Sequence, residues 1–243
     1  MVAKARPDGY TIGVATTSTH AVSVSVYKKL PYDPVTDFEY AGFIGASPFL
    51  LVVNAGINAP DVKSLITLLR KNPDRYSFAS VGAGTVSHLL GEQFKAIVGT
   101  PLVHVPYKGS SPAYTDLIGG QVQMMFDNPE SLSPQLQAGT LRAIATTAPT
   151  VLANIPTFAQ QGYPAFDSSL WYGLVFPKGT AADIVQKFNA ALNKVLADPA
   201  VDKAFASKGI NVQPGTRGAM LAAVTKDVQY WAGMARSVGI ALD

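Results

Sequence analysis

Apolar runs of strand length alternate along the middle of the chain with longer segments in which apolar residues recur at helical spacing. Runs rich in β-branched and aromatic residues predict strands at 10–15, 40–44, 49–54, 76–80, 102–105, 122–126, 141–146 and 170–176. Helical spacing and capping residues predict helices from Asp61 to Lys71 and at 21–30, 86–98, 113–118, 134–138, 180–197, 201–208 and 218–238. Strands separated by helices are typical of βαβ units, so we expect an α/β fold with a largely parallel sheet.

The alternating pattern also predicts how the chain divides. The block 54–168 is expected to form a self-contained lobe, lobe II. The flanking segments 1–53 and 169–243 are then expected to come together as a discontinuous lobe I. We place the two crossings between the lobes at 51–53 and 171–173.

Composition narrows the possible functions. The chain has 243 residues, of which 48% are hydrophobic, enough for a sizeable core. Its net charge of +3 is small and its Lys and Arg residues are scattered, so no nucleic-acid partner is expected. The absence of cysteine excludes disulfides and zinc–thiolate sites, and no apolar run is long enough to span a membrane.

The sharpest local motif is a glycine-rich turn between a predicted strand and a predicted helix, at 78–88. Such a turn leaves the first backbone N–H groups of the helix available to an anion, at the positive end of the helix dipole. The candidate ligand-binding residues here are Ser80, Gly82, Ala83, Gly84, Thr85 and Ser87. The alternative is a tight connection that Thr85 caps. The dinucleotide fingerprint fails because Ser87 occupies its third glycine position, and no Lys follows the turn as a P-loop requires.

A second hydroxyl-rich loop, 15–20, also precedes a predicted helix. Thr16 and Thr17 are therefore candidates for the same ligand, and His20 is a possible addition. Helix capping alone would also explain the hydroxyls.

Two further strand ends carry polar residues. Tyr107 and Lys108 follow one strand, and Asp127 and Asn128 follow another. Ligands of open α/β sheets bind outside the carboxyl ends of the strands, so Asp127 is a candidate ligand-binding residue and Tyr107, Lys108 and Asn128 are possible contacts. Lys108 could equally be a solvated lysine, and Asp127 could hold a neighbouring loop instead of a ligand.

The sequence offers little for catalysis. His20, His88 and His104 lack the spacing of a metal-binding motif, and no serine lies in a nucleophile elbow. Ser87 and His88 are adjacent on a predicted helix, so their side chains should diverge. Sites rich in N–H and hydroxyl donors but poor in bases are typical of binding, so we expect no catalytic residue, no metal and no cofactor.

An ordered set of motifs resembles the Bug-type substrate-binding proteins of tripartite tricarboxylate transporters, and it covers essentially the whole chain. The matching segments include Pro7-Asp8-Gly9-Tyr10-Thr11, Leu30-Pro31-Tyr32-Asp33-Pro34, Ser77-Phe78-Ala79-Ser80, His104-Val105-Pro106-Tyr107-Lys108-Gly109, Asp116-Leu117-Ile118-Gly119-Gly120 and Trp171-Tyr172-Gly173-Leu174.

The resemblance implies a type II periplasmic-binding-protein fold, with two Rossmann-like lobes joined by two crossing strands. It implies that the protein captures a small carboxylate at the lobe interface, in the periplasm, and delivers it to the membrane subunits of a transporter. The ligand would be a di- or tricarboxylate, an amino acid or an aromatic acid. Two alternatives stay open: a clamp that presents its ligand to a sensor partner, and an α/β enzyme acting on a carboxylate.

The chain departs from the family pattern at its start. Family members usually have a leader and a strand–helix–strand unit before the Pro-Asp-Gly-Tyr motif, which here occupies residues 7–10. A unit of that kind needs roughly 30 residues. Lobe I is therefore expected to lack its N-terminal strand–helix–strand, to expose a sheet edge, and to bind ligand poorly or self-associate.

Overall fold

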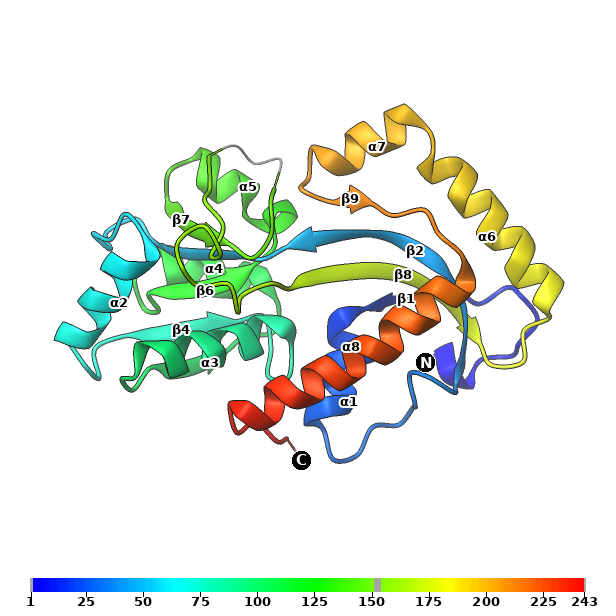
Figure 1. Ribbon diagram of the computed structural model, residues 1–243, viewed down its shortest axis with the longest axis horizontal. Helices are drawn as coiled ribbons and strands as arrows, with labels where there is room; N and C mark the ends of the chain where they lie inside the picture. Colours follow the sequence, from blue (N-terminus) through cyan, green and yellow to red (C-terminus); the bar gives the residue numbers. More distant parts are fainter. Residues whose placement is uncertain (1, 151–153, 243) are drawn as a thin grey trace. The chain divides into compact units, whose positions relative to one another are not determined.

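The computed structural model describes residues 2–150 and 154–242, and the chain divides into two compact units (Figure 1). Unit 1 comprises Met1–Ala46 together with Leu170–Asp243, and unit 2 comprises Ser47–Ser169. The first boundary lies between Ala46 and Ser47, earlier than the expected 53/54. Residues 50–54 form a strand that pairs within unit 2, so they are not a crossing between the units. The second boundary lies one residue after the expected 168/169.

The sheet of unit 2 has five strands in the order β5-β4-β6-β3-β7. They are β3 (Leu50–Asn54), β4 (Ser77–Ser80), β5 (Val103–Pro106), β6 (Met124–Asp127) and β7 (Leu141–Thr146). β4 pairs in parallel with β5 and β6, whereas β3 pairs antiparallel with β6 and β7. β4, β5, β6 and β7 therefore share one direction, as their alternation with helices predicted.

The expectation of largely parallel pairing is wrong for β3. This strand follows β2 (Phe38–Pro48) after a single residue, so no crossover helix returns the chain to the starting edge of the sheet. It is also wrong for unit 1, whose sheet has the order β1-β8-β2-β9. There β1 (Gly13–Thr16) pairs antiparallel with β8 (Ser169–Pro177), and β2 pairs antiparallel with β9 (Asn211–Val212).

The helices of unit 2 are α2 (Val62–Lys71), α3 (Val86–Val98), α4 (Ser110–Ile118) and α5 (Pro129–Gln137). The bounds of α3 are those the sequence predicted, and Asp61 caps α2 as expected, its Oδ1 accepting from the Ser64 N–H at 2.7 Å. The helix expected at 134–138 instead begins at Pro129. A proline in the first turn costs nothing, because the N–H it lacks would have no partner within the helix.

Aromatic rings form the deepest part of the core of unit 2. Phe158 and Phe166 stack at 4.3 Å between ring centroids, and Phe126 stacks on Phe166 at 5.9 Å. Phe94 of α3 packs on both Phe126 and Phe166. These buried rings pack the C-terminal half of α3 against β6.

Unit 1 contains the short helices η1 (Val2–Lys4), η2 (Ser18–Val22) and α1 (Ser23–Val26), and the longer α6 (Ala182–Leu196), α7 (Pro199–Ala206) and α8 (Arg217–Ser237). The helix expected at 21–30 begins at Ser18 and ends at Val26, because Tyr27 adopts an extended conformation. Trp171 packs with Met220 and Val224 of α8, and its Nε1 donates to Asp227 Oδ2 at 2.7 Å. Among the described residues, no helix combines the length and apolar character needed to cross a bilayer.

Gly91, within α3, leaves space for the ring of Phe78. A Cβ at this position would overlap the Phe78 side chain, which is buried. We expect Gly91→Ala to lower the free energy of unfolding by about 1–3 kcal/mol, because overpacking outweighs the gain in helix propensity. Gly233 of α8 is the matched control, since a Cβ there meets nothing within 4 Å. Gly233→Ala should raise the free energy of unfolding by up to about 1 kcal/mol, as urea denaturation of both variants would show.

Candidate functional site

The glycine-rich turn of unit 2 connects β4 to α3 through residues 81–85. Gly84 has φ +70°, in the left-handed region, and Gly82 has φ +156°. Side chains are strained in this region, so the two glycines allow the backbone to turn sharply into the helix. The turn therefore places the positive end of the α3 dipole beside the carboxyl ends of the strands.

Hydroxyl groups hold the turn from both sides. Thr85 is the N-cap: its Oγ1 accepts from the His88 N–H at 3.4 Å and donates to the Gly82 carbonyl at 2.8 Å. Ser80 is fully buried, and its Oγ contacts the Gly82 carbonyl at 3.1 Å. Ser87 Oγ donates to the Phe126 carbonyl at 2.5 Å, which ties α3 to β6. The capping interpretation of Thr85 is thus confirmed, and these hydroxyls shape the turn in addition to any contact they make with a ligand.

Two imidazoles stand directly behind the turn. The rings of His88 and His104 are stacked, with centroids 3.8 Å apart and planes 14° apart, and Phe78 stacks on His104 at 4.9 Å. The Gly84 N–H donates to His88 Nδ1 at 3.2 Å, and His104 Nε2 lies 2.7 Å from Ser80 Oγ. Burial lowers the pKa of each imidazole to about 4, with a smaller contribution from Lys95 to His88 and from His88 and Lys95 to His104. Both are therefore neutral at pH 7.

His88, His104 and Glu92 also place potential metal-ligand atoms within 4.8 Å of one another. The stacked orientation argues against shared coordination, because the lone pairs of the two imidazoles lie in separate, nearly parallel ring planes and do not meet at one metal position. Glu92 is already paired with Lys95, at 3.3 Å between Oε2 and Nζ. The cluster fits a structural role better than a metal centre.

The loop that follows β5 lies against the same turn. The Tyr107 N–H donates to the Ser80 carbonyl at 3.0 Å, and the Gly109 N–H donates to the Val81 carbonyl at 3.1 Å. Tyr107 itself donates to Asp116 Oδ2 at 2.7 Å, and Lys108 is exposed. The structure thus brings the loop that contains Tyr107 and Lys108 against the turn.

Asp127 and Asn128 are buried at the end of β6. Asp127 Oδ2 accepts from the Tyr114 hydroxyl at 2.7 Å, and its Oδ1 accepts from the Asn128 N–H at 2.8 Å. The Asn128 amide donates to the Pro48 carbonyl at 2.8 Å. Burial raises the pKa of the Asp127 carboxyl, and hydrogen bonds from Tyr114 and Ser110 act in the opposite direction. Both oxygens of Asp127 have partners within the protein, as expected of a residue that holds a loop.

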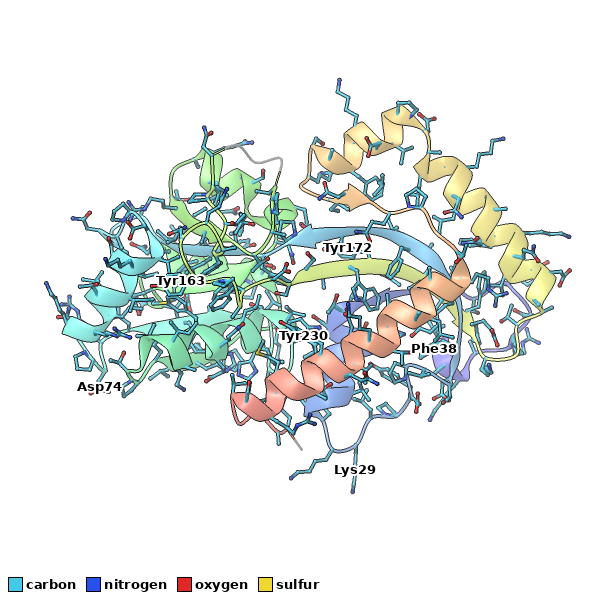
Figure 2. The ribbon with its side chains drawn as sticks, in the orientation of Figure 1. Lys29, Phe38, Asp74, Tyr163, Tyr172 and Tyr230 are labelled. Atoms are coloured by element: carbon cyan, nitrogen blue, oxygen red, sulfur yellow. The ribbon has the colours of Figure 1, made fainter. Side chains whose placement is uncertain are left out.

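The candidates of the 15–20 loop lie in unit 1 and are described there alone. Thr17 is fully buried and its Oγ1 accepts from the Trp171 N–H at 2.9 Å. Thr16 is partly exposed, and its N–H donates to Thr19 Oγ1 at 3.1 Å. His20 packs beside Phe38, with ring centroids 4.8 Å apart and planes inclined by 53°. Phe38, labelled in Figure 2, is the first residue of β2. Its Nε2 has no hydrogen-bond partner among the described residues. The predicted contact of these residues with a ligand stays a prediction.

The sequence did not predict which side chains support the turn and Asp127 from within unit 2. His104 and Phe78 are paired in register on neighbouring parallel strands, but that register is not visible in the sequence of either strand. Tyr114 was not singled out because an isolated tyrosine on an apolar helix face gives no signal of a buried carboxylate partner. The polar hydroxyls of the turn itself were identified, because the glycine pattern marks them directly.

Comparison with known proteins identifies the family. The model of the tripartite tricarboxylate transporter family receptor (TctC) matches residues 1–239. The structure of the periplasmic binding protein BugD is similar, with a TM-score of 0.91 and 32% identity over 99% of this chain and 82% of that one.

Two solved structures from Rhodopseudomonas palustris contain dicarboxylates. Rpa4515 with adipate has a TM-score of 0.94 and 32% identity over 99% of this chain and 81% of that one. MatC (Rpa3494) with bound malate has a TM-score of 0.88 and 28% identity over 96% of this chain and 81% of that one. The periplasmic-binding-protein fold expected from the sequence is confirmed by these similarities. The chain belongs to the tripartite tricarboxylate transporter family of receptors and is of the Bug type.

Proposed function

We propose that this protein captures a small di- or tricarboxylate in the periplasm for the membrane subunits of a tripartite transporter, and that the turn 80–87 of unit 2 binds one carboxylate of the ligand. The observation that carries the proposal is the turn itself. It combines two glycines of positive φ, a capped helix start and the positive end of a helix dipole. Backbone N–H groups in such an arrangement are suited to a carboxylate.

The ligands of two similar proteins support the chemical class. Adipate and malate differ in length and in hydroxyl substitution, but each carries two carboxylates. Attraction to the positive end of a helix dipole depends on the carboxylate itself and not on the rest of the ligand. We therefore assign one carboxylate of the ligand to the turn, and other parts of the protein would contact the rest of the ligand.

The side chains around the turn that could act as a base or nucleophile already make hydrogen bonds within the protein, which favours binding without chemical conversion. Ser87 Oγ donates to a backbone carbonyl, the lone pair of His88 Nδ1 accepts from the Gly84 N–H, and the oxygens of Asp127 accept from Tyr114 and Asn128. A base or nucleophile must reach the proton or the atom it attacks, and these groups face the protein. We propose that the protein is a binding protein and not an enzyme.

The first test is a thermal-shift screen with adipate, malate and citrate. Each ligand that binds the folded state should raise the melting temperature, by an amount that corresponds to about 2.7 kcal/mol at a concentration a hundredfold above its Kd. Adipamide is the matched neutral control, since it has the length of adipate without the charges. No rise with any carboxylate, or an equal rise with adipamide, would contradict the proposal.

A pair of helix-cap variants localises the site. We expect Thr85→Ala to weaken the binding of a carboxylate found in the screen by about tenfold, since the hydroxyl that fixes the turn is lost. Thr216 caps α8 of unit 1 in the same manner, with Oγ1 accepting from the Ala219 N–H at 3.1 Å. Thr216→Ala should cost a similar amount of stability, about 1 kcal/mol, and leave the affinity unchanged. Calorimetric titration of both variants measures this difference, and equal affinities would place the ligand elsewhere.

A further inference from the structure

The turn that we propose to bind a carboxylate is backed by a column of three rings. Phe78 comes from β4, His104 from β5 and His88 from α3, and adjacent centroids are 4.9 Å and 3.8 Å apart. Phe78 and His88 are almost completely buried, and His104 is partly buried. The column thus links the three elements that surround the turn into one packed unit.

Each imidazole holds a different part of the turn. His104 Nε2 lies 2.7 Å from Ser80 Oγ, at the end of β4. His88 Nδ1 accepts from the Gly84 N–H at 3.2 Å, just before the helix begins. Accepting this bond fixes the direction of the Gly84 peptide plane, and the neighbouring peptides of a tight turn are fixed with it.

The hydrogen bond from Gly84 specifies how His88 is protonated. Because Gly84 donates to His88 Nδ1, the neutral ring carries its proton on Nε2, which lies 3.9 Å from Glu92 Oε1. Ser80 Oγ has both the Gly82 carbonyl and His104 Nε2 within reach of its single proton, so the bond between Ser80 and His104 can run in either direction.

Two charged residues of α3 lie close to the pair: Glu92, whose Oε1 is 3.9 Å from His88 Nε2, and Lys95, which pairs with Glu92 at 3.3 Å. β4 contributes Phe78 and Ser80, and the turn contributes Gly82 and Gly84, none of which titrates in the physiological range. A proton on His88 Nδ1 would remove the acceptor of the Gly84 N–H, and a second proton on His104 would stack two cations.

We propose that His88 and His104 are positioning residues for carboxylate binding: as a stacked neutral pair they hold residues 80–84 in the conformation that receives the ligand. This inference rests on the proposed function of the turn. Neither imidazole needs to touch the ligand, because each acts through the backbone or hydroxyl that it holds. A preorganised turn binds more tightly because less ordering is required when the ligand arrives.

Substitutions can separate hydrogen bonding from stacking. His88→Phe and His104→Phe keep a flat ring in the column and lose the hydrogen bond. His88→Asn and His104→Gln lose the ring but keep a polar group near the position of Nδ1 and Nε2, respectively. We expect each Phe variant to weaken adipate binding by about fivefold or more at pH 7, and the Asn and Gln variants to stay within about twofold of the original chain. Calorimetric titration with adipate gives these affinities.

The control is Phe158→Leu, in the aromatic core of unit 2, which should lower the melting temperature without changing the affinity. If the Phe variants bind adipate as the original chain does, or if the Asn and Gln variants lose as much affinity as the Phe variants, the inference is wrong. If the original chain binds neither adipate, malate nor citrate, the proposed function itself is wrong.

A spectroscopic measurement tests the pair independently of any ligand. The chain has three histidines, so long-range ¹H–¹⁵N spectra resolve the nitrogen shifts of each ring. We expect His88 to remain the Nε2–H tautomer and His104 to remain neutral from pH 7.5 to pH 5, with or without adipate. A proton on His88 Nδ1 at pH 7 would rule out the bond from Gly84 and overturn the inference.

Discussion

The free energy of unfolding is expected to fall as the pH is lowered from about 6.5 towards 4. Burial lowers the pKa of His20, His88 and His104 from 6.5 to about 4 in the folded protein. In the unfolded chain the same groups take up protons near pH 6.5, so the unfolded state binds more protons throughout this range and gains stability on acidification. His20 and His88, which are buried, each contribute at most about 3 kcal/mol to the loss, and the partly exposed His104 contributes less.

Two carboxyls act in the opposite direction. Burial raises the pKa of Asp127 and Asp227 in the folded protein, so these groups bind protons more readily when folded and stabilise the fold on acidification. Their contribution grows as the pH approaches the ordinary carboxyl range. The net loss should therefore be steepest between about pH 6.5 and 5, where the histidines dominate.

Urea denaturation at pH 7.5, 6.5, 6.0, 5.5 and 5.0 measures the effect. The slope expected from each buried histidine is about 1.4 kcal/mol per pH unit, so His88→Asn should reduce the total slope by about that amount. A free energy of unfolding that stays constant from pH 7 to pH 5 would contradict the buried, neutral state of the three rings. That result would also remove the physical basis of the stacked pair behind the turn.

The parts of the fold that the sequence predicted are those with strong local signals. The apolar spacing of 86–98 and the capping residue Thr85 define α3, and Asp61 defines the start of α2. The antiparallel insertion of β3 and the two-residue strand β9 were not predicted. Strand direction depends on pairing between distant segments, and a strand of two residues has no periodicity to detect.

In the candidate site too, local features were predicted and contacts between distant segments were not. The turn 80–87 was predicted because two glycines and a capping threonine are contiguous in the chain. The stacking of His88 on His104 joins residues from two different elements, and the pairing of Asp127 with Tyr114 depends on how α4 packs beside β6. Local patterns can therefore indicate a loop of ligand-binding type, but its supporting side chains become visible only after the sheet is assembled.

Asp127→Ala is expected to lower the free energy of unfolding by about 3 kcal/mol. The substitution leaves the Tyr114 hydroxyl and the Asn128 N–H without their acceptor, and both residues are buried. Tyr114→Phe removes only one hydrogen bond and should cost about 1–2 kcal/mol. The double variant should lose less than the two single variants together, because the hydroxyl that Asp127→Ala leaves unsatisfied is no longer present.

A second tyrosine–aspartate pair provides the control for this prediction. Tyr107 donates to Asp116 at 2.7 Å, the same distance as in the pair of Tyr114 and Asp127, but both residues are partly exposed. Water can replace the lost acceptor, so Asp116→Ala should cost no more than about 1 kcal/mol. If urea denaturation gives similar losses for the two alanine variants, Asp127 does not hold its loop through buried hydrogen bonds. A direct contact of Asp127 with a ligand hydroxyl would then be the better account. In that case Asp127→Ala would lower the affinity for malate, which has a hydroxyl, and would not lower the affinity for adipate, which has none.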